Sequence, residues 1–146
     1  MVLVDMQKGL RILFLSIVAI CFSCEDQGLF VKCADCVADE PVKTELEIKL
    51  ENSTYYPDAI IQIWEGNLED NVLLITSTLR AYTSTYRQEV TINKKYTVTA
   101  TYNFLTDTYI AVDSATPRVK YEKNQCNDPC YYVYDKVIDL RLKYTK

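Results

Sequence analysis

The sequence predicts an all-β protein whose residues 44–146 form a single antiparallel β-sandwich. From position 44 onward, apolar side chains recur at every second residue, which is the period of a half-buried strand. Turn-forming residues interrupt this pattern roughly every ten residues, as in sandwiches built from short strands. No stretch after residue 43 keeps an apolar stripe with helical spacing for three turns. We therefore expect seven or eight strands and no helix in this region.

The first half of the domain contains four expected strands. In the first of them, Leu46, Ile48 and Leu50 alternate with charged residues. In the second, Trp64 shares a face with Ile60, and we expect its ring to lie in the core. Residues 66–71 have the composition of a turn. The four expected strands are residues 44–51, 59–65, 72–78 and 84–92.

Residues 96–104 give the clearest strand signal. Five apolar or aromatic residues there alternate with three threonines and an asparagine. Threonine has high strand propensity and suits the outer face of a sheet. The chain then turns at residues 105–107, and the remaining expected strands are residues 108–113, 118–122 and 136–144.

The segment from Val90 to Ala100 resembles the corner and strand of immunoglobulin-like or fibronectin type III-like sandwiches. In those folds a tyrosine at the start of the strand bonds back to upstream backbone. The resemblance implies this role for Tyr96, and it implies that the first and last strands lie side by side and parallel. It covers residues 90–100 and the strand count, so it concerns architecture and not activity.

Residues 1–23 are predicted to be a signal peptide that forms a helix. Lys8 and Arg11 precede the apolar run 12–22, and the small residue Ser23 follows it. A helix that crosses a bilayer needs about 20 apolar residues, so this run is short for a membrane span. An uncleaved anchor remains the alternative.

Residues 20–24 (ICFSC) resemble a relaxed bacterial lipoprotein signal, in which the cysteine after the cleavage site is acylated. Cys24 follows the small residue Ser23, whereas Cys21 follows the branched residue Ile20. The resemblance implies that Cys24 carries palmitate-type chains and anchors the protein in the outer membrane of a Gram-negative cell envelope. The acidic pair after Cys24 resembles a surface-export signal. Residues 24–43 are then the lipidated N-terminus and a flexible tether.

Composition excludes several classes of function. The chain has a net charge of −4, no histidine and three glycines. Nucleic-acid binding needs clustered positive charge, and histidine-based triads, HExxH zinc sites and glycine-rich phosphate loops need residues that are missing. No pair of carboxylates can be placed across a cleft for glycoside hydrolysis. We therefore expect no catalysis, no cofactor, no metal and no nucleic-acid partner.

Four cysteines remain beyond the leader, in two pairs. Cys33 and Cys36 precede the first strand, and Cys126 and Cys130 precede the last. If those strands are neighbours, both pairs lie at the same end of the domain. Disulfides are favoured outside the cytoplasm, and bonds between the pairs are slightly favoured because they close longer loops. A four-cysteine zinc site and a redox dithiol at Cys33 and Cys36 are the alternatives.

Tyrosine is abundant, with 12 residues in the chain. Rigid aromatic side chains near loops suit contacts with a protein or a glycan. The competing explanation is packing, since tyrosine is common on half-buried sheet faces. The candidate binding residues are Tyr55, Tyr56, Tyr131, Tyr132 and Tyr134.

These observations predict a lipid-anchored envelope protein that acts as a non-catalytic binding or structural module. The alternative is a thiol-redox or zinc-holding protein that works through its four cysteines. A third hypothesis is a subunit of a surface assembly, joined by strand addition at an exposed sheet edge.

Overall fold

The computed structural model describes residues 31–51, 58–80 and 82–143. This part of the chain contains nine strands, two single turns of 3-10 helix (η1 and η2) and no α-helix. The expected all-β class is therefore confirmed, whereas the expected signal helix over residues 1–23 lies outside the described residues. The elements are η1 (Cys33–Asp35), β1 (Lys43–Lys49), β2 (Asp58–Glu65), η2 (Leu68–Asp70), β3 (Val72–Arg80), β4 (Thr85–Thr91), β5 (Tyr96–Phe104), β6 (Asp107–Ala115), β7 (Arg118–Glu122), β8 (Cys130–Tyr134) and β9 (Val137–Asp139).

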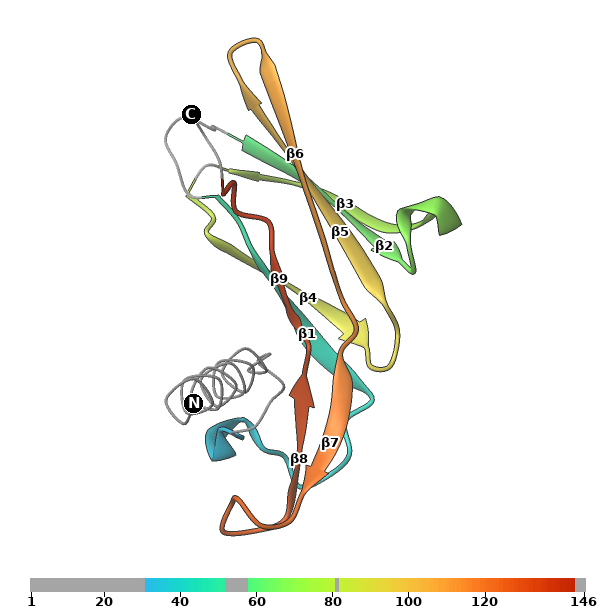
Figure 1. Cartoon of the computed structure of the whole chain (residues 1–146), viewed down its shortest axis with the longest axis vertical. Coiled ribbons are helices and arrows are strands. Elements are labelled where there is room, and N and C mark those ends of the chain that lie inside the picture. Colours follow the sequence, from blue (N-terminus) through green and yellow to red (C-terminus); the bar gives the residue numbers. More distant parts are fainter. Residues whose placement is uncertain (1–30, 52–57, 81, 144–146) are drawn as a thin grey trace, which may run out of the picture. The chain divides into compact units, whose positions relative to one another are not determined.

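The strands form three sheets (Figure 1). A four-stranded antiparallel sheet has the order β3-β2-β5-β6, a three-stranded sheet has the order β4-β1-β9, and β7 pairs with β8 alone. Strands β1 and β9 are parallel, with Ile48 opposite Ile138. The first and last strands of the domain are thus neighbours, as the resemblance implied.

The two larger sheets share one buried core. Leu46 and Ile48 of β1 and Ile138 of β9 are completely buried in the same cluster as Ile63 of β2 and Val98 of β5. Full burial of each such side chain contributes about 1.5–3 kcal/mol relative to exposure. The arrangement of several sheets around this core is compatible with a β-sandwich.

Tyr96 makes the backbone contact expected at the start of its strand. Its buried hydroxyl donates to the Thr91 carbonyl oxygen at 3.1 Å and accepts from the Thr91 amide, also at 3.1 Å. One side chain thereby satisfies both backbone groups of a residue at the end of β4. This interaction closes the corner between the two sheets.

One expectation about the four-stranded sheet is wrong. Trp64 is half-buried and lies outside the core, because Ile61 and Ile63 occupy the inward positions of β2. Thr97 and Thr99 of β5 lie on the outer face of this sheet, as expected, and are buried there. Thr97 pairs with Trp64 across the sheet, and its hydroxyl donates to the Gly66 carbonyl oxygen at 2.7 Å. A central strand between two neighbours leaves little room for water beside a short side chain.

The turn expected over residues 66–71 is confirmed, and it explains one glycine. Gly66 has a φ of 85°, a left-handed conformation that residues with a Cβ rarely adopt. A Cβ at this position would lie 2.5 Å from an Asp70 carboxylate oxygen. That carboxylate accepts a hydrogen bond from the Asn67 amide at 2.7 Å and so closes the turn around η2.

The end of the chain differs most from expectation. Strand β8 was not expected, and β9 covers three residues of the strand expected over residues 136–144. The contact with β1 continues past β9, since the Leu140 amide donates to the Lys49 carbonyl oxygen at 2.9 Å. Residues 31–51, 58–80 and 82–143 contain no helix long and apolar enough to cross a membrane.

Candidate functional site

The four cysteines expected to pair form two disulfides that join distant parts of the chain. Cys33 is bonded to Cys126, with Cα atoms 5.6 Å apart, and Cys36 is bonded to Cys130, with Cα atoms 5.5 Å apart. Both Cα separations fall within the usual range for disulfides. Disulfide bonding is confirmed, and the connectivity is the one between the two pairs. The cysteine pairs also lie at the same end of the domain.

The 3-10 turn η1 explains how Cys33 and Cys36 reach the same partner loop. In this geometry side chains three residues apart eclipse each other. The Cys36 amide donates to the Cys33 carbonyl oxygen at 3.3 Å, which holds the turn closed. Cys33 therefore reaches Cys126 in the loop between β7 and β8, and Cys36 reaches Cys130 at the start of β8.

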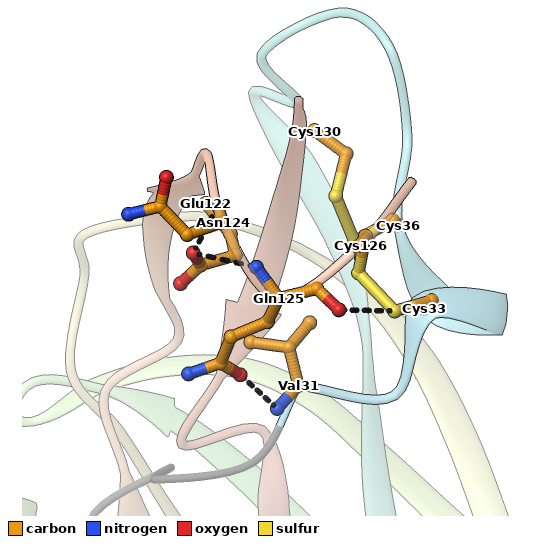
Figure 2. The surroundings of a disulfide bond; sticks show 8 residues. All are labelled: Val31, Cys33, Cys36, Glu122, Asn124, Gln125, Cys126 and Cys130. Carbon is orange, nitrogen blue, oxygen red and sulfur yellow. Dashed lines mark hydrogen bonds between the residues drawn. A yellow bond between two sulfur atoms is a disulfide. The ribbon is translucent and has the colours of Figure 1, made fainter. Parts of the chain in front are cut away.

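The segment before β1 is also hydrogen-bonded to this loop and to β8. Val37 and Tyr131 exchange two backbone hydrogen bonds of 2.9 and 2.8 Å. The Val31 amide donates to the Gln125 side-chain oxygen at 3.0 Å (Figure 2). Residues 31–37, expected to belong to a flexible tether, are thus held against the domain.

Glu122 organises the loop that carries Cys126. Its carboxylate accepts hydrogen bonds from the Asn124 amide at 2.8 Å and from the Gln125 amide at 3.3 Å. The hydrogen bond from the Asn124 amide is the main cause of a lowered pKa for Glu122. The ionised carboxylate therefore acts as a local cap, a role that carboxylates fill in turns.

The two disulfides touch each other. Cys36 Sγ lies 3.8 Å from Cys126 Sγ, although the two residues are not bonded (Figure 2). The sulfurs of Cys36, Cys126 and Cys130 all lie within 4.8 Å of one another. Zinc binds thiolates, and a disulfide sulfur has no thiolate to offer. The expected alternatives of a zinc site and a redox dithiol therefore both require that these bonds first be reduced.

An open hollow lies beside the sulfur cluster. Its volume is about 410 Å³, and Gln125, Asp128 and Pro129 line it together with all four cysteines. Cys33 is exposed, Cys36 and Cys126 are half-buried, and Cys130 is buried. All four cysteines therefore border the hollow, and Cys33 is the most exposed of them.

The candidate tyrosines do not form one surface. Tyr55 and Tyr56 lie outside the described residues. On β8, Tyr132 is buried and 7% exposed, and it shares a face with Tyr134, whereas Tyr131 points to the opposite face. Tyr132 therefore packs in the protein, as the competing explanation expected.

Tyr121 is a candidate contact residue that the sequence analysis did not identify. It pairs with Tyr131 across the β7–β8 sheet, with ring centroids 4.8 Å apart, and remains 43% exposed. The Lys123 ammonium lies 5.6 Å from the centre of the Tyr121 ring, within the range of a cation–π contact. A lone tyrosine in a short strand carries no signal that would have distinguished it.

Comparisons of the chain with family models, curated proteins and solved structures found no match.

Proposed function

We propose that this chain is a lipid-anchored protein of a bacterial cell envelope whose domain acts as a non-catalytic binding or structural module. The leader with Lys8 and Arg11 before an apolar run supports export, and Cys24 is the proposed lipidation site. The two disulfides between distant segments carry the proposal, because such bonds persist outside reducing compartments. Surface display, supported by the acidic pair after Cys24, is part of the same proposal.

The proposed domain architecture is an immunoglobulin-like sandwich. In that fold, strands B and E are neighbours in one sheet, and C′, C, F and G can follow each other in the second. The pairing of β1 with β4 fits B and E, and the order β3-β2-β5-β6 fits C′, C, F and G. Tyr96 then begins strand F, which is the place of the tyrosine corner. Strand β9 fills the position beside β1 that strand A would take.

The proposed contact site for a protein or glycan partner is the ring pair of the exposed Tyr121 and the half-buried Tyr131. Rigid rings lose little conformational entropy on binding and present apolar area next to a polar tip. Lys123 beside Tyr121 adds a positive charge to this contact. The pair lies on the sheet that the disulfide-bonded segment supports, so its backbone is held in place before binding.

A pull-down from the envelope fraction tests this proposal. We expect the full chain to recover a partner in constant ratio and Tyr121→Ala to recover much less of it. Tyr82→Ala is the control, because Tyr82 is 82% exposed and lies outside the β7–β8 sheet. Recovery of the protein alone, or equal recovery by both variants, would contradict the proposed site.

A surface assembly is a second candidate function, and the edge of the four-stranded sheet favours it. Strand β3 has one neighbour, β2, within the described part of the chain, and Val72, Leu73 and Leu74 are all exposed. An edge of this kind can accept a strand from another chain. Concentration-dependent sedimentation that Leu74→Lys abolishes would support it, whereas a monomer at all concentrations would contradict it.

A further inference from the structure

The contact between the two disulfides brings four sulfur atoms into one row. Cys33 is bonded to Cys126, Cys126 touches Cys36 at 3.8 Å, and Cys36 is bonded to Cys130 (Figure 2). The atoms at the contact belong to different disulfides. A thiolate formed at Cys126 would therefore lie directly beside a sulfur atom of the remaining disulfide.

Exposure falls along the same row. All four cysteines border the open hollow, but Cys33 is exposed, the two sulfur atoms in contact belong to half-buried residues, and Cys130 is buried. Access is one of the factors that determine which sulfur of a disulfide a thiolate attacks. An external thiol therefore meets Cys33 first, and its attack there releases the sulfur of Cys126 and not that of Cys33.

We propose that the four cysteines form a thiol–disulfide exchange site. Attack of an external thiol on the exposed Cys33 leads, through exchange between the two disulfides, to release of the thiol of the buried Cys130. In the first step an external thiolate attacks Cys33 Sγ. The Cys33–Cys126 bond breaks, a mixed disulfide forms at Cys33, and Cys126 leaves as a thiolate.

In the second step the Cys126 thiolate attacks Cys36 Sγ. The Cys36–Cys130 bond breaks, a Cys36–Cys126 bond forms, and Cys130 leaves as a thiolate. A second external thiol then attacks the mixed disulfide and frees Cys33. In total, two external thiols are oxidised to one disulfide, and one protein disulfide is reduced to the thiols of Cys33 and Cys130, which take up the two protons.

The exchange keeps the N-terminal segment attached to the domain. The bond formed between Cys36 and Cys126 still joins η1 to the loop before β8. The partly reduced protein would thus retain its cross-link and hold one exposed and one buried thiol. The substrate class is an accessible thiol, and the site does not depend on the proposed membrane anchor or on the proposed partner.

A matched pair of variants tests the second step without any reductant. Cys33→Ser and Cys126→Ser each remove the same disulfide and leave one unpaired thiol. Cys33→Ser leaves the thiol of Cys126 beside Cys36. Cys126→Ser leaves the thiol of Cys33, and Cys33 does not belong to the group of Cys36, Cys126 and Cys130, whose sulfurs lie within 4.8 Å of one another. Digestion with pepsin at low pH stops exchange, because thiols are then protonated. Fragmentation of the linked peptides in the mass spectrometer reads the pairing, because Cys126 and Cys130 are only four residues apart and lie in the same peptide.

We expect Cys33→Ser to contain both Cys36–Cys130 and Cys36–Cys126 peptides, and Cys126→Ser to retain Cys36–Cys130. Non-native pairing should be on the order of tenfold more abundant in Cys33→Ser, because the reacting atoms are already in contact. Native pairing alone in both variants, or equal scrambling in both, would overturn the proposal.

The unmodified cysteines provide a second test that no folding defect can obscure. The chain is treated with increasing glutathione, alkylated and mapped in the same way. The expected species with one disulfide holds Cys36–Cys126, with alkyl groups on Cys33 and Cys130. A species that retains Cys36–Cys130, with alkyl groups on Cys33 and Cys126, would show that no internal transfer takes place.

Discussion

Ile48 and Ile138 lie opposite each other across the parallel pair of β1 and β9, and both side chains are completely buried. One belongs to the first strand of the domain and the other to the last. The last strand therefore contributes to the core although it is only three residues long.

Replacement of Ile138 by alanine should destabilise the protein strongly. Loss of a fully buried isoleucine side chain costs about 2–5 kcal/mol, because it removes apolar burial and leaves a cavity. Urea unfolding of the two proteins measures this difference. Val137→Ala is the control on the same strand, since Val137 is 45% exposed, and it should change the free energy of unfolding by much less. Equal losses in both variants would contradict the assigned orientation of β9.

Tyr96→Phe should lower stability by about 1–3 kcal/mol, because it removes both hydrogen bonds to the Thr91 backbone, each of which contributes about 0.5–1.5 kcal/mol. The ring itself remains, so packing changes little. Tyr82→Phe removes the same atom from an exposed side chain and should have an effect within about 0.5 kcal/mol. Equal denaturation midpoints for Tyr96→Phe and the unchanged protein would show that the Tyr96 hydrogen bonds to Thr91 do not stabilise the fold.

Much of this architecture could be predicted from the sequence. Alternation located β5 with the bounds that the structure has, the extended segment expected after Pro117 matches β7, and the turn at Gly66 followed from local composition. Strand β8 was missed because Cys130–Tyr134 is a continuous apolar and aromatic run, so no period marks it. Its partner β7 lies in a separate sheet, and periodicity within one segment carries no information about pairing between segments.

The site could be predicted only in part for the same reason. Four cysteines allow three connectivities, and the choice depends on where β8 places Cys130 relative to η1. The contact of the two disulfides is a distance between atoms that are 90 residues apart in the chain. Tyr121 became a candidate only when its pairing with Tyr131 was known.

Removal of either disulfide alone should cost much less stability than removal of the remaining one. The two disulfides span 93 and 94 residues, so either one alone closes nearly the whole loop. In the chain-entropy account the first cross-link contributes about 4.7 kcal/mol, whereas the second closes only a small ring and contributes about 2 kcal/mol. Replacement of Cys33 and Cys126 by alanine should therefore cost about 2 kcal/mol, and replacement of all four cysteines about 7 kcal/mol. Chemical unfolding of the two variants measures these losses of stability. If removal of the second disulfide costs no more than removal of the first, the two bonds do not close the same loop.

Asp139 should contribute a pH-dependent part of the stability. Its hydrogen bonds with the Arg141 guanidinium, of 2.8 and 2.7 Å, lower the pKa of the carboxyl to about 2. Because the pKa in the folded protein is lower than in the unfolded chain, this stabilisation is complete above the unfolded pKa of about 3.9 and is lost as the pH falls toward 2.

Carbon-detected NMR of the Asp139 carboxyl group measures this pKa directly. We expect a midpoint near 2. Arg141→Met should raise the midpoint toward the ordinary value for aspartate, because it removes the guanidinium. Asp139→Asn should lose less stability than the unchanged protein between pH 5 and pH 2. An ordinary aspartate pKa for Asp139 in the unchanged protein would contradict the expected effect of Arg141 on this carboxyl group.

The mass of the N-terminal peptide from the membrane fraction tests the proposed anchor most directly. If Cys24 is lipidated, the mature chain begins at this residue, and its first peptide carries the added mass of a diacylglyceryl group, with or without a further acyl chain. Cys24→Ala should abolish that species, whereas Cys21→Ala should leave it unchanged. A mature chain that begins at any other residue, or an unmodified Cys24, would contradict the account of this protein as an envelope lipoprotein.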